Sequence, residues 1–553
     1  MKQPSGAAEP YDPISLEIMW SKLTSIVDEA AAALVRSSFS TIVRESNDYC
    51  CGLLDTEARS LAESSYSIPL FMGTLSRTVQ HFLKQFPADT WRPGDVVITN
   101  DPWMGTGHLP DITLAIPVFL EGRLVAFAAN VAHAPDIGGI IWSADSRDVF
   151  EEGLAIPPMR LFHEGERNEH LFRMIEANVR VPDQVIGDLY AQVASAETCR
   201  QHLLAFLESS TTGVNLKALG KAIQGRAEAA VRGAIAKLPD GTYCNEITAD
   251  GLDTPLSIAC ELTVAGDTIE VDYSGTSEQA SRGINCVWNV TNAYTAYAIK
   301  CVLDPETPKN EGSYLPIIVS APEGTLLNPV FPAPVNARGL IAQYIPAVVY
   351  GALAQVIPER VIADSGSPAT RFVFAGHAAD GRRFSQIFLP WGGMGARPTK
   401  DGISVIAFPS NSGVGSMEIV EALTPLVVWR KALVPDSGGP GKFRGGLGQE
   451  FVIEVGGENE IQLSVLGERM QHPPEGLFGG RPGGLAGVML ESGRPVDPKG
   501  RTQVRPGDIL TLRYAGGGGY GDPAERDSSA VEDDLKNGLV TEEAARDVYG
   551  HGK

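Results

Sequence analysis

Two histidines and two aspartates within one short stretch of the chain have the residue types and spacing of a metal site. His108 is followed three residues later by Asp111, and His133 is followed three residues later by Asp136. Imidazole nitrogens and carboxylate oxygens together suit zinc, manganese or iron(II). An ion with an open coordination position would bind a water molecule and lower its pKa. A hydrogen-bonded His–Asp pair without any metal explains the same spacing equally well.

The predicted secondary structure brings these side chains together. Residues 112–119 and 124–131 have the pattern of β-strands, and the Glu-Gly-Arg turn at 121–123 predicts that they form a hairpin. One histidine precedes the first strand and the other follows the second, so both would lie at the same end of the hairpin. Asp48 directly precedes an apolar run, residues 49–54, and could join them.

The rest of the chain alternates between helical and strand patterns, which predicts an α+β fold with several domains. Asp12 followed by proline predicts the start of a helix that runs to residue 38. Further helices are expected at 183–207, 216–238, 289–303 and 341–357, and further strands at 95–99, within 242–275, and at 451–455, 461–466 and 508–514. We expect an α+β metal-site domain (1–240), a central α/β region (241–431), a glycine-rich β region (432–526) and a helical tail (527–553).

Composition excludes several classes of protein. The chain has 553 residues, 43% of them apolar, and a formal net charge of −22, which is typical of a globular protein and argues against binding to nucleic acid or anionic membranes. The seven cysteines include no CxxC pair, so neither a disulfide framework nor a cysteine zinc site is expected. The N-terminal residues lack an apolar signal region, and we expect a cytoplasmic protein.

No nucleotide-binding motif is present. Residues 438–443 (Gly-Gly-Pro-Gly-Lys-Phe) lack the first glycine and the final Ser or Thr of a Walker A motif, and the chain has no strand-associated GxGxxG, HExxH or GxSxG. Arg338 could bind an anionic substrate or form a structural ion pair, and these alternatives remain open. The glycines at 516–521 favour a sharp turn over an anion-binding nest, and Cys50 and Cys51 favour buried packing.

The sequence resembles the hydantoinase B/5-oxoprolinase family over nearly its whole length. This family includes the B subunits of ATP-dependent N-methylhydantoinases and caprolactamases, the C-terminal part of 5-oxoprolinase, and large subunits of acetone and acetophenone carboxylases. The stretches that carry the resemblance are 44–48, 99–111, 130–139, 152–153, 272–277, 334–338, 392–395, 438–446 and 516–523.

The resemblance implies a ligand set for a divalent transition metal: zinc, manganese or iron. The family pattern Asp…His-x-x-Asp…His falls on Asp48, His108, Asp111 and His133, which would hold the ion and serve catalysis. Asp136 would then orient the His133 imidazole.

The resemblance also implies a partner. A hydantoinase A-type subunit would bind ATP and Mg²⁺ and phosphorylate a cyclic amide, and this chain would hydrolyse the activated substrate with a metal-bound hydroxide. Two copies of each subunit are expected. The alternatives are a subunit of an acetone- or acetophenone-type carboxylase and a non-catalytic scaffold. The substrate, whether hydantoin, lactam, oxoproline or ketone, is left open.

Overall fold

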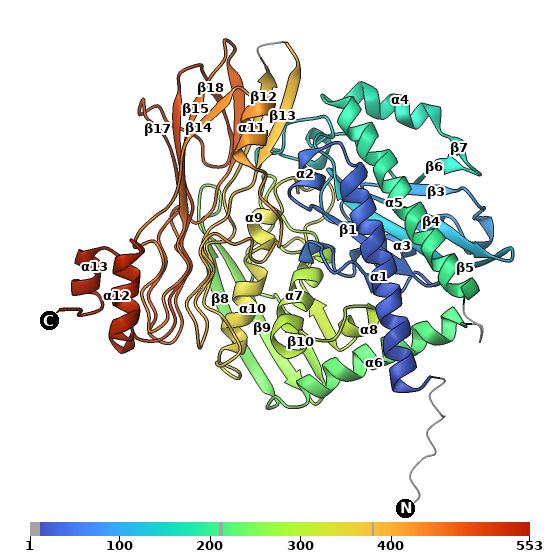
Figure 1. Cartoon of the computed structure of the whole chain (residues 1–553), viewed down its shortest axis with the longest axis horizontal. Coiled ribbons are helices and arrows are strands. Elements are labelled where there is room, and N and C mark those ends of the chain that lie inside the picture. The colour runs from blue at the N-terminus through green and yellow to red at the C-terminus, as the bar shows by residue number, and fades with distance from the viewer. Residues whose placement is uncertain (1–10, 210–213, 379–380, 553) are drawn as a thin grey trace, which may run out of the picture.

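A computed structural model describes residues 11–209, 214–378 and 381–552. It confirms the expected α+β, multidomain class, with helices and one large sheet towards the N-terminus and two β-sheets towards the C-terminus (Figure 1). The helices are α1 (Pro13–Ser37), α2 (Thr41–Arg44), α3 (Thr74–Gln85), α4 (Glu169–Asn178), α5 (Pro182–Ser209), α6 (Leu216–Ile235), α7 (Trp288–Leu303), α8 (Glu311–Tyr314), α9 (Gly339–Ala342), α10 (Ile345–Leu353), α11 (Met417–Leu423), α12 (Ser528–Lys536) and α13 (Glu542–Asp547).

The N-terminal sheet has seven antiparallel strands in the order β2-β1-β5-β4-β3-β6-β7. Helices cover both of its faces. Successive residues of a strand point to opposite faces of a sheet, so two neighbouring residues of β1 report on both sides. Cys51 contacts Ser195 of α5 on one face, and a Cβ on the neighbouring Gly52 would touch Leu75 of α3 on the other. The strands are β1 (Tyr49–Leu54), β2 (Ser60–Glu63), β3 (Val96–Thr99), β4 (Asp111–Leu120), β5 (Arg123–His133), β6 (Met159–His163) and β7 (Glu166–Arg167).

Local sequence signals account for the start of α1 and for the β4–β5 hairpin at the middle of the sheet. Asp12 caps α1 by accepting hydrogen bonds from the backbone N–H groups of Ile14 and Ser15, as predicted from its position before a proline. Between β4 and β5, Glu121 and Gly122 both have positive φ, 49° and 74°, which gives a two-residue turn of the type that matches strand twist. The predicted hairpin is confirmed.

A four-stranded sheet in the order β11-β10-β9-β8 forms the middle of the molecule. Helix α10 packs on β8 and β9, and α7 packs on α10. The predicted helix 341–357 is divided into α9 and α10, with Pro346 in the first turn of α10. The strands are β8 (Gly241–Ala249), β9 (Leu256–Ala265), β10 (Thr268–Asp272) and β11 (Ile317–Ser320).

The C-terminal half contains two four-stranded sheets, β13-β12-β16-β18 and β14-β15-β19-β17. Both sheets cross the predicted boundary at 431/432, because β12 pairs with β16 and β14 begins at Leu426, so that boundary does not separate two units. The strands are β12 (Arg371–His377), β13 (Arg383–Phe388), β14 (Leu426–Leu433), β15 (Gln449–Val455), β16 (Ile461–Leu466), β17 (Gly487–Leu490), β18 (Arg501–Val504) and β19 (Ile509–Arg513).

The glycine-rich segments pack backbone against backbone. A Cβ on Gly516 would lie 1.7 Å from the carbonyl oxygen of Ser437, and one on Gly393 would lie 1.9 Å from that of Gly446. Gly517 donates a hydrogen bond to the carbonyl of Gly446. The interpretation of 516–521 as mainly a sharp turn is therefore wrong, since these glycines allow close approach of neighbouring extended segments.

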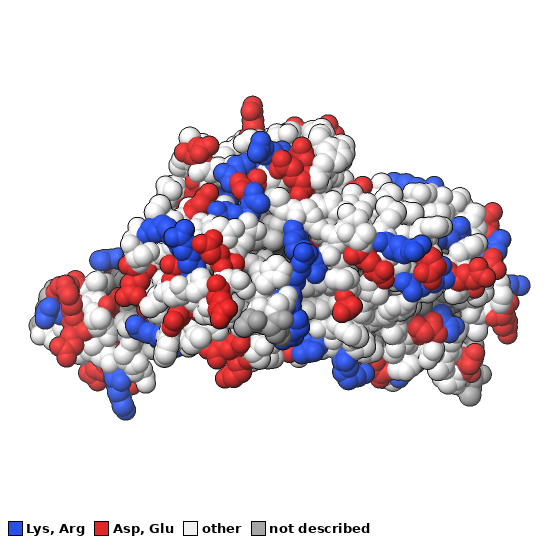
Figure 2. Space-filling view, turned by 90° about the horizontal axis from the view of Figure 1, so that it is seen from above, with Lys and Arg blue, Asp and Glu red and all other residues white. Residues whose placement is uncertain are grey.

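One apolar core runs through all of the sheets, from Leu16 to Tyr514, and a small separate cluster (Val531, Val540 and Ala545) lies in the C-terminal tail. Within the described residues, no helix combines the length and apolar character needed to cross a membrane. Acidic and basic side chains are interspersed on the face shown in Figure 2. The boundaries at 240/241 and 526/527 stay predictions.

Candidate metal centre

The end of β5 lies between the ends of β1 and β4, and this arrangement assembles the predicted metal site. Asp111, the first residue of β4, is directly opposite His133, the last residue of β5. On the other side, the His133 N–H donates to the backbone carbonyl of Asp48 at 3.0 Å. The predicted β4–β5 pairing therefore places Asp111 beside His133, and the pairing of β5 with β1, which the sequence did not predict, places Asp48 on the other side of the same histidine.

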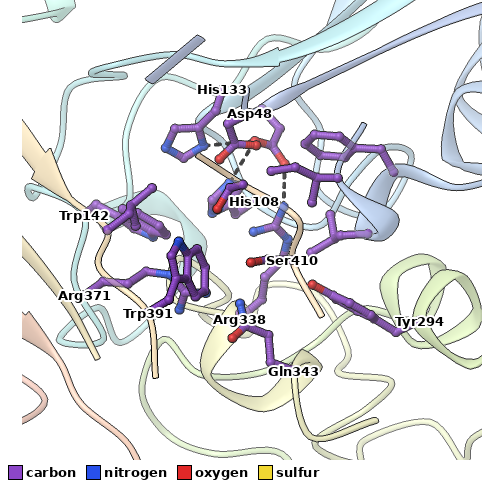
Figure 3. Close-up of a pocket in the computed structure, with 17 residues that line it drawn as sticks. Asp48, His108, His133, Trp142, Tyr294, Arg338, Gln343, Arg371, Trp391 and Ser410 are labelled. Atoms are coloured by element: carbon purple, nitrogen blue, oxygen red, sulfur yellow. Dashed lines mark hydrogen bonds and ion pairs between the residues drawn. The ribbon is translucent and has the colours of Figure 1, made fainter. Parts of the chain in front are cut away.

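Three buried side chains form a compact cluster at this sheet edge (Figure 3). Asp111 Oδ1 lies 3.0 Å from His108 Nε2 and 3.0 Å from His133 Nδ1. The potential ligand atoms of the three residues all lie within 4.8 Å of one another. This spacing suits one ion bound by two nitrogens and an oxygen.

The protonation state of His108 fits a metal ligand. Its Nδ1 lies 2.8 Å from the backbone carbonyl of Asn336, which can only accept, so Nδ1 carries the proton and Nε2 carries a lone pair. Burial and the nearby Arg338 lower the pKa of His108 to about 4, which leaves the ring neutral at pH 7. The Nε2 lone pair then faces the Asp111 carboxylate without a proton between them, a repulsion that a shared cation removes.

Asp48 lines the same pocket but lies outside the group of three. It is half-buried, and burial raises the pKa of its carboxyl to about 6. The structure thus brings three of the four predicted ligands into one cluster and places the fourth at the rim of that cluster. These residues fit a divalent metal, with Asp48 as an additional oxygen donor.

The second carboxylate oxygen of Asp111 is held by other groups. Oδ2 accepts hydrogen bonds from Thr106 Oγ1 at 2.7 Å and from the Arg338 guanidinium. Although burial opposes ionisation, His108 and Arg338 hold the pKa of Asp111 well below its usual range. Gly107 has φ +94°, and a Cβ there would lie 2.7 Å from Arg338 Cδ, so this glycine is needed for the arginine to pack. Arg338 thus forms the structural ion pair, and it also lines the pocket, so its binding of an anionic substrate stays a prediction.

The prediction for Asp136 is wrong. Its carboxylate binds the backbone N–H and guanidinium of Arg180 and the N–H of Gly138. The His133 Nδ1 instead interacts with Asp111. The chain leaves the sheet after His133, and Asp136 anchors the following loop to the segment before α5.

Cys50 and Cys51 are buried thiols, as expected, and burial raises the pKa of both.

Glu152, which sequence reasoning did not select as a site residue, orients His108 through the backbone. Its Oε1 accepts hydrogen bonds from Ser146 Oγ (2.8 Å) and from the N–H groups of Val335 (2.6 Å) and Asn336 (2.9 Å). The carbonyl of Asn336 then accepts from His108 Nδ1. Burial raises the pKa of Glu152 to about 7. The only sequence signal for this residue was its place in a stretch shared with the family.

We expect Glu152→Ala to lower metal affinity about tenfold to a hundredfold, because the support of the His108 ring is lost. Unfolding free energy should fall by about 1–3 kcal/mol, since two buried N–H groups lose their acceptor. Glu152→Gln retains an acceptor oxygen and is the matched control. Metal titration and denaturant unfolding of both variants measure these effects, and equal metal affinity in wild type and Glu152→Ala would refute the positioning role.

Comparison with known proteins identifies the family. The hydantoinase B/oxoprolinase family model matches residues 12–523. The chain belongs to this family. It is 30% identical to the beta subunit of caprolactamase from Pseudomonas jessenii over 98% of its length and 96% of the relative's. It is 31% identical, over 98% of its length and 95% of the relative's, to a protein of Pseudomonas sp. (strain NS671) whose provisional name is that of a D-/L-hydantoinase B subunit.

Two solved structures have the same fold. The crystal structure of the ATP-dependent caprolactamase from Pseudomonas jessenii superposes with a TM-score of 0.90 at 28% identity, covering 98% of this chain and 96% of that one. Acetone carboxylase superposes with a TM-score of 0.89, but at 21% identity and over 79% of its chain, so this match shows the fold alone.

Proposed function

We propose that this chain is the metal-bearing subunit of an ATP-dependent hydrolase of cyclic amides. The observation that carries the proposal is the buried cluster of His108, Asp111 and His133, with Asp48 beside it, in a chain that spans 96% of the caprolactamase beta subunit. The 30% identity to the caprolactamase beta subunit, over almost the whole of both chains, favours a hydrolase over a carboxylase subunit. Zinc, manganese and iron(II) all suit the donor set.

His108, Asp111, His133 and Asp48 would hold the ion, which when bound supplies a Lewis acid and lowers the pKa of a coordinated water. The protein's own contribution is to fix these ligands before substrate arrives. Arg338 and Thr106 hold one oxygen of Asp111, so the other oxygen is turned towards the histidines. Trp142 packs against both imidazoles, with ring centroids 5.9 Å from His108 and 5.1 Å from His133, and lines the same pocket.

An unstrained cyclic amide is a poor electrophile, and phosphorylation of its oxygen makes the carbonyl carbon reactive and supplies a leaving group. The sequence has no phosphate-binding motif, so we assign ATP binding to an A-type partner, as the word subunit in the names of its relatives suggests. An assembly of two copies of each subunit is part of this proposal.

The isolated chain should neither bind ATP nor open a cyclic amide, because it lacks a phosphate-binding loop. Calorimetry with ATP should show no micromolar binding to the isolated chain. The complex with the A-type subunit should couple ATP hydrolysis to ring opening when tested against hydantoins, lactams and 5-oxoproline. Micromolar ATP binding to the chain alone would contradict the division of labour, and a complex that carboxylates ketones but opens no ring would contradict the hydrolase assignment.

A further inference from the structure

The wall of the pocket away from Asp48 and His133 carries several polar side chains (Figure 3). Four buried side chains that line it carry an atom with no hydrogen-bond partner among the described residues: Arg371 Nη1, Trp391 Nε1, Ser410 Oγ and Gln343 Oε1. Buried polar groups are almost always satisfied, so a cluster of unsatisfied ones in a single pocket indicates a ligand site. Three of the four atoms belong to hydrogen-bond donors.

Arg371 is the most unusual of these residues. It is only 5% exposed, and no carboxylate pairs with it in the part of the chain that the structure describes. The other buried arginines of that part are each paired: Arg338 with Asp111, Arg444 with Asp534, Arg469 with Asp364, and Arg526 with Asp401 and Asp534. Burial of a guanidinium without a counter-ion lowers the free energy of unfolding. We therefore expect its counter-ion to be an anionic ligand from outside the chain.

The charge of the pocket indicates what that anion is. Asp48 and Asp111 cancel the charges of Arg338 and Arg371, so a divalent cation would leave the pocket with two positive charges. Burial lowers the pKa of Arg371 only to about 10, which leaves the guanidinium protonated at neutral pH. A phosphoryl monoester carries a charge of about −1.5 to −2. A carboxylate carries only one negative charge and would leave the pocket positive.

We propose that Arg371, together with the Trp391 N–H and the Ser410 hydroxyl, binds the phosphoryl oxygens of the activated substrate. This proposal rests on the proposed function and names the part of the site that recognises the phosphorylated species. A planar guanidinium binds phosphate oxygens with two parallel hydrogen bonds, and the indole and hydroxyl donors supply further ones. Trp391 and Ser412 also line a neighbouring cavity of about 820 Å³, so this part of the pocket adjoins a larger space.

The test is phosphate binding to the isolated, metal-loaded chain, with inorganic phosphate as the probe. Calorimetry should show that Arg371→Met weakens phosphate binding about tenfold or more, because a charged donor is lost. Trp391→Phe, which removes the N–H donor and keeps an aromatic ring, should weaken it by a smaller factor. Arg505→Met is the matched control, since Arg505 is exposed and pairs with Glu460 outside the pocket. Acetate serves as the carboxylate probe, and its binding should change little.

Unchanged phosphate affinity in Arg371→Met, or no phosphate binding to the metal-loaded wild type, would overturn the proposal. A loss confined to acetate would overturn it in favour of a carboxylate site.

Thermal unfolding and metal content of the variants show whether Arg371 binds the ligand or only supports the fold. Removal of an unpaired buried charge should leave the melting temperature unchanged or higher and the metal in place. A lower melting temperature with loss of metal would contradict the proposal. None of these measurements needs the partner or ring opening, so failure here is distinct from failure of the hydrolase assignment.

Discussion

Replacing His108 with alanine should strip the metal from the protein and lower turnover of the assembled enzyme more than about a hundredfold. Loss of a group that merely supports a ligand commonly costs tenfold to a hundredfold in metal affinity or activity, and loss of the ligand itself should cost more. The fold should survive, because His108 lies in a loop and its side chain donates a single hydrogen bond, to the Asn336 carbonyl. Elemental analysis and a turnover assay on the same preparation measure both effects.

His163→Ala is the matched control for this variant. His163 is 55% exposed and interacts with Asp95, and it belongs to β6, two strands from β4 in the sheet. The control should retain full metal content and activity. A His108→Ala enzyme that keeps its metal and its turnover would show that the cluster is only a set of hydrogen-bonded side chains.

Asp111→Ala is a less informative variant, although the sequence alone gives no reason to separate it from His108→Ala. The structure supplies that reason, since Asp111 is the carboxylate partner of the buried Arg338. Removing one member of a buried ion pair typically costs about 3–5 kcal/mol. Loss of activity in Asp111→Ala would therefore combine a lost ligand with a destabilised fold.

The parts of the site that could be predicted from the sequence are those determined by residues close together in the chain. The β4–β5 hairpin follows from its alternating strands and short turn, and it places His108, Asp111 and His133 at one end without any long-range information. The role of Asp136 was mispredicted because spacing cannot distinguish a side chain directed at the histidine from one directed at Arg180.

The opposite wall of the pocket could not be predicted in this way. Arg371 begins β12, while Trp391 and Ser410 lie in irregular segments beyond β13, and no local pattern relates them to the histidines. The boundary at 431/432 failed for the same kind of reason, because pairing of β12 with β16 is non-local. The glycine-rich segment 516–521 was misread, because a segment that packs closely against other backbones is as rich in glycine as a turn.

The central claim is that the proposed metal centre serves ring opening and not phosphorylation, and one measurement on an Asp48→Ala complex tests it most directly. Phosphate release and ring-opened product are measured on the same sample, with circular dichroism to confirm that the variant is folded. Asp48 lies beside the cluster of His108, Asp111 and His133, and the sequence has no motif that could hold a triphosphate. We predict that the complex continues to consume ATP while product formation falls at least about tenfold, as for loss of a group that supports a metal site. Equal loss of both activities in the folded variant, or normal product formation without bound metal, would contradict the account.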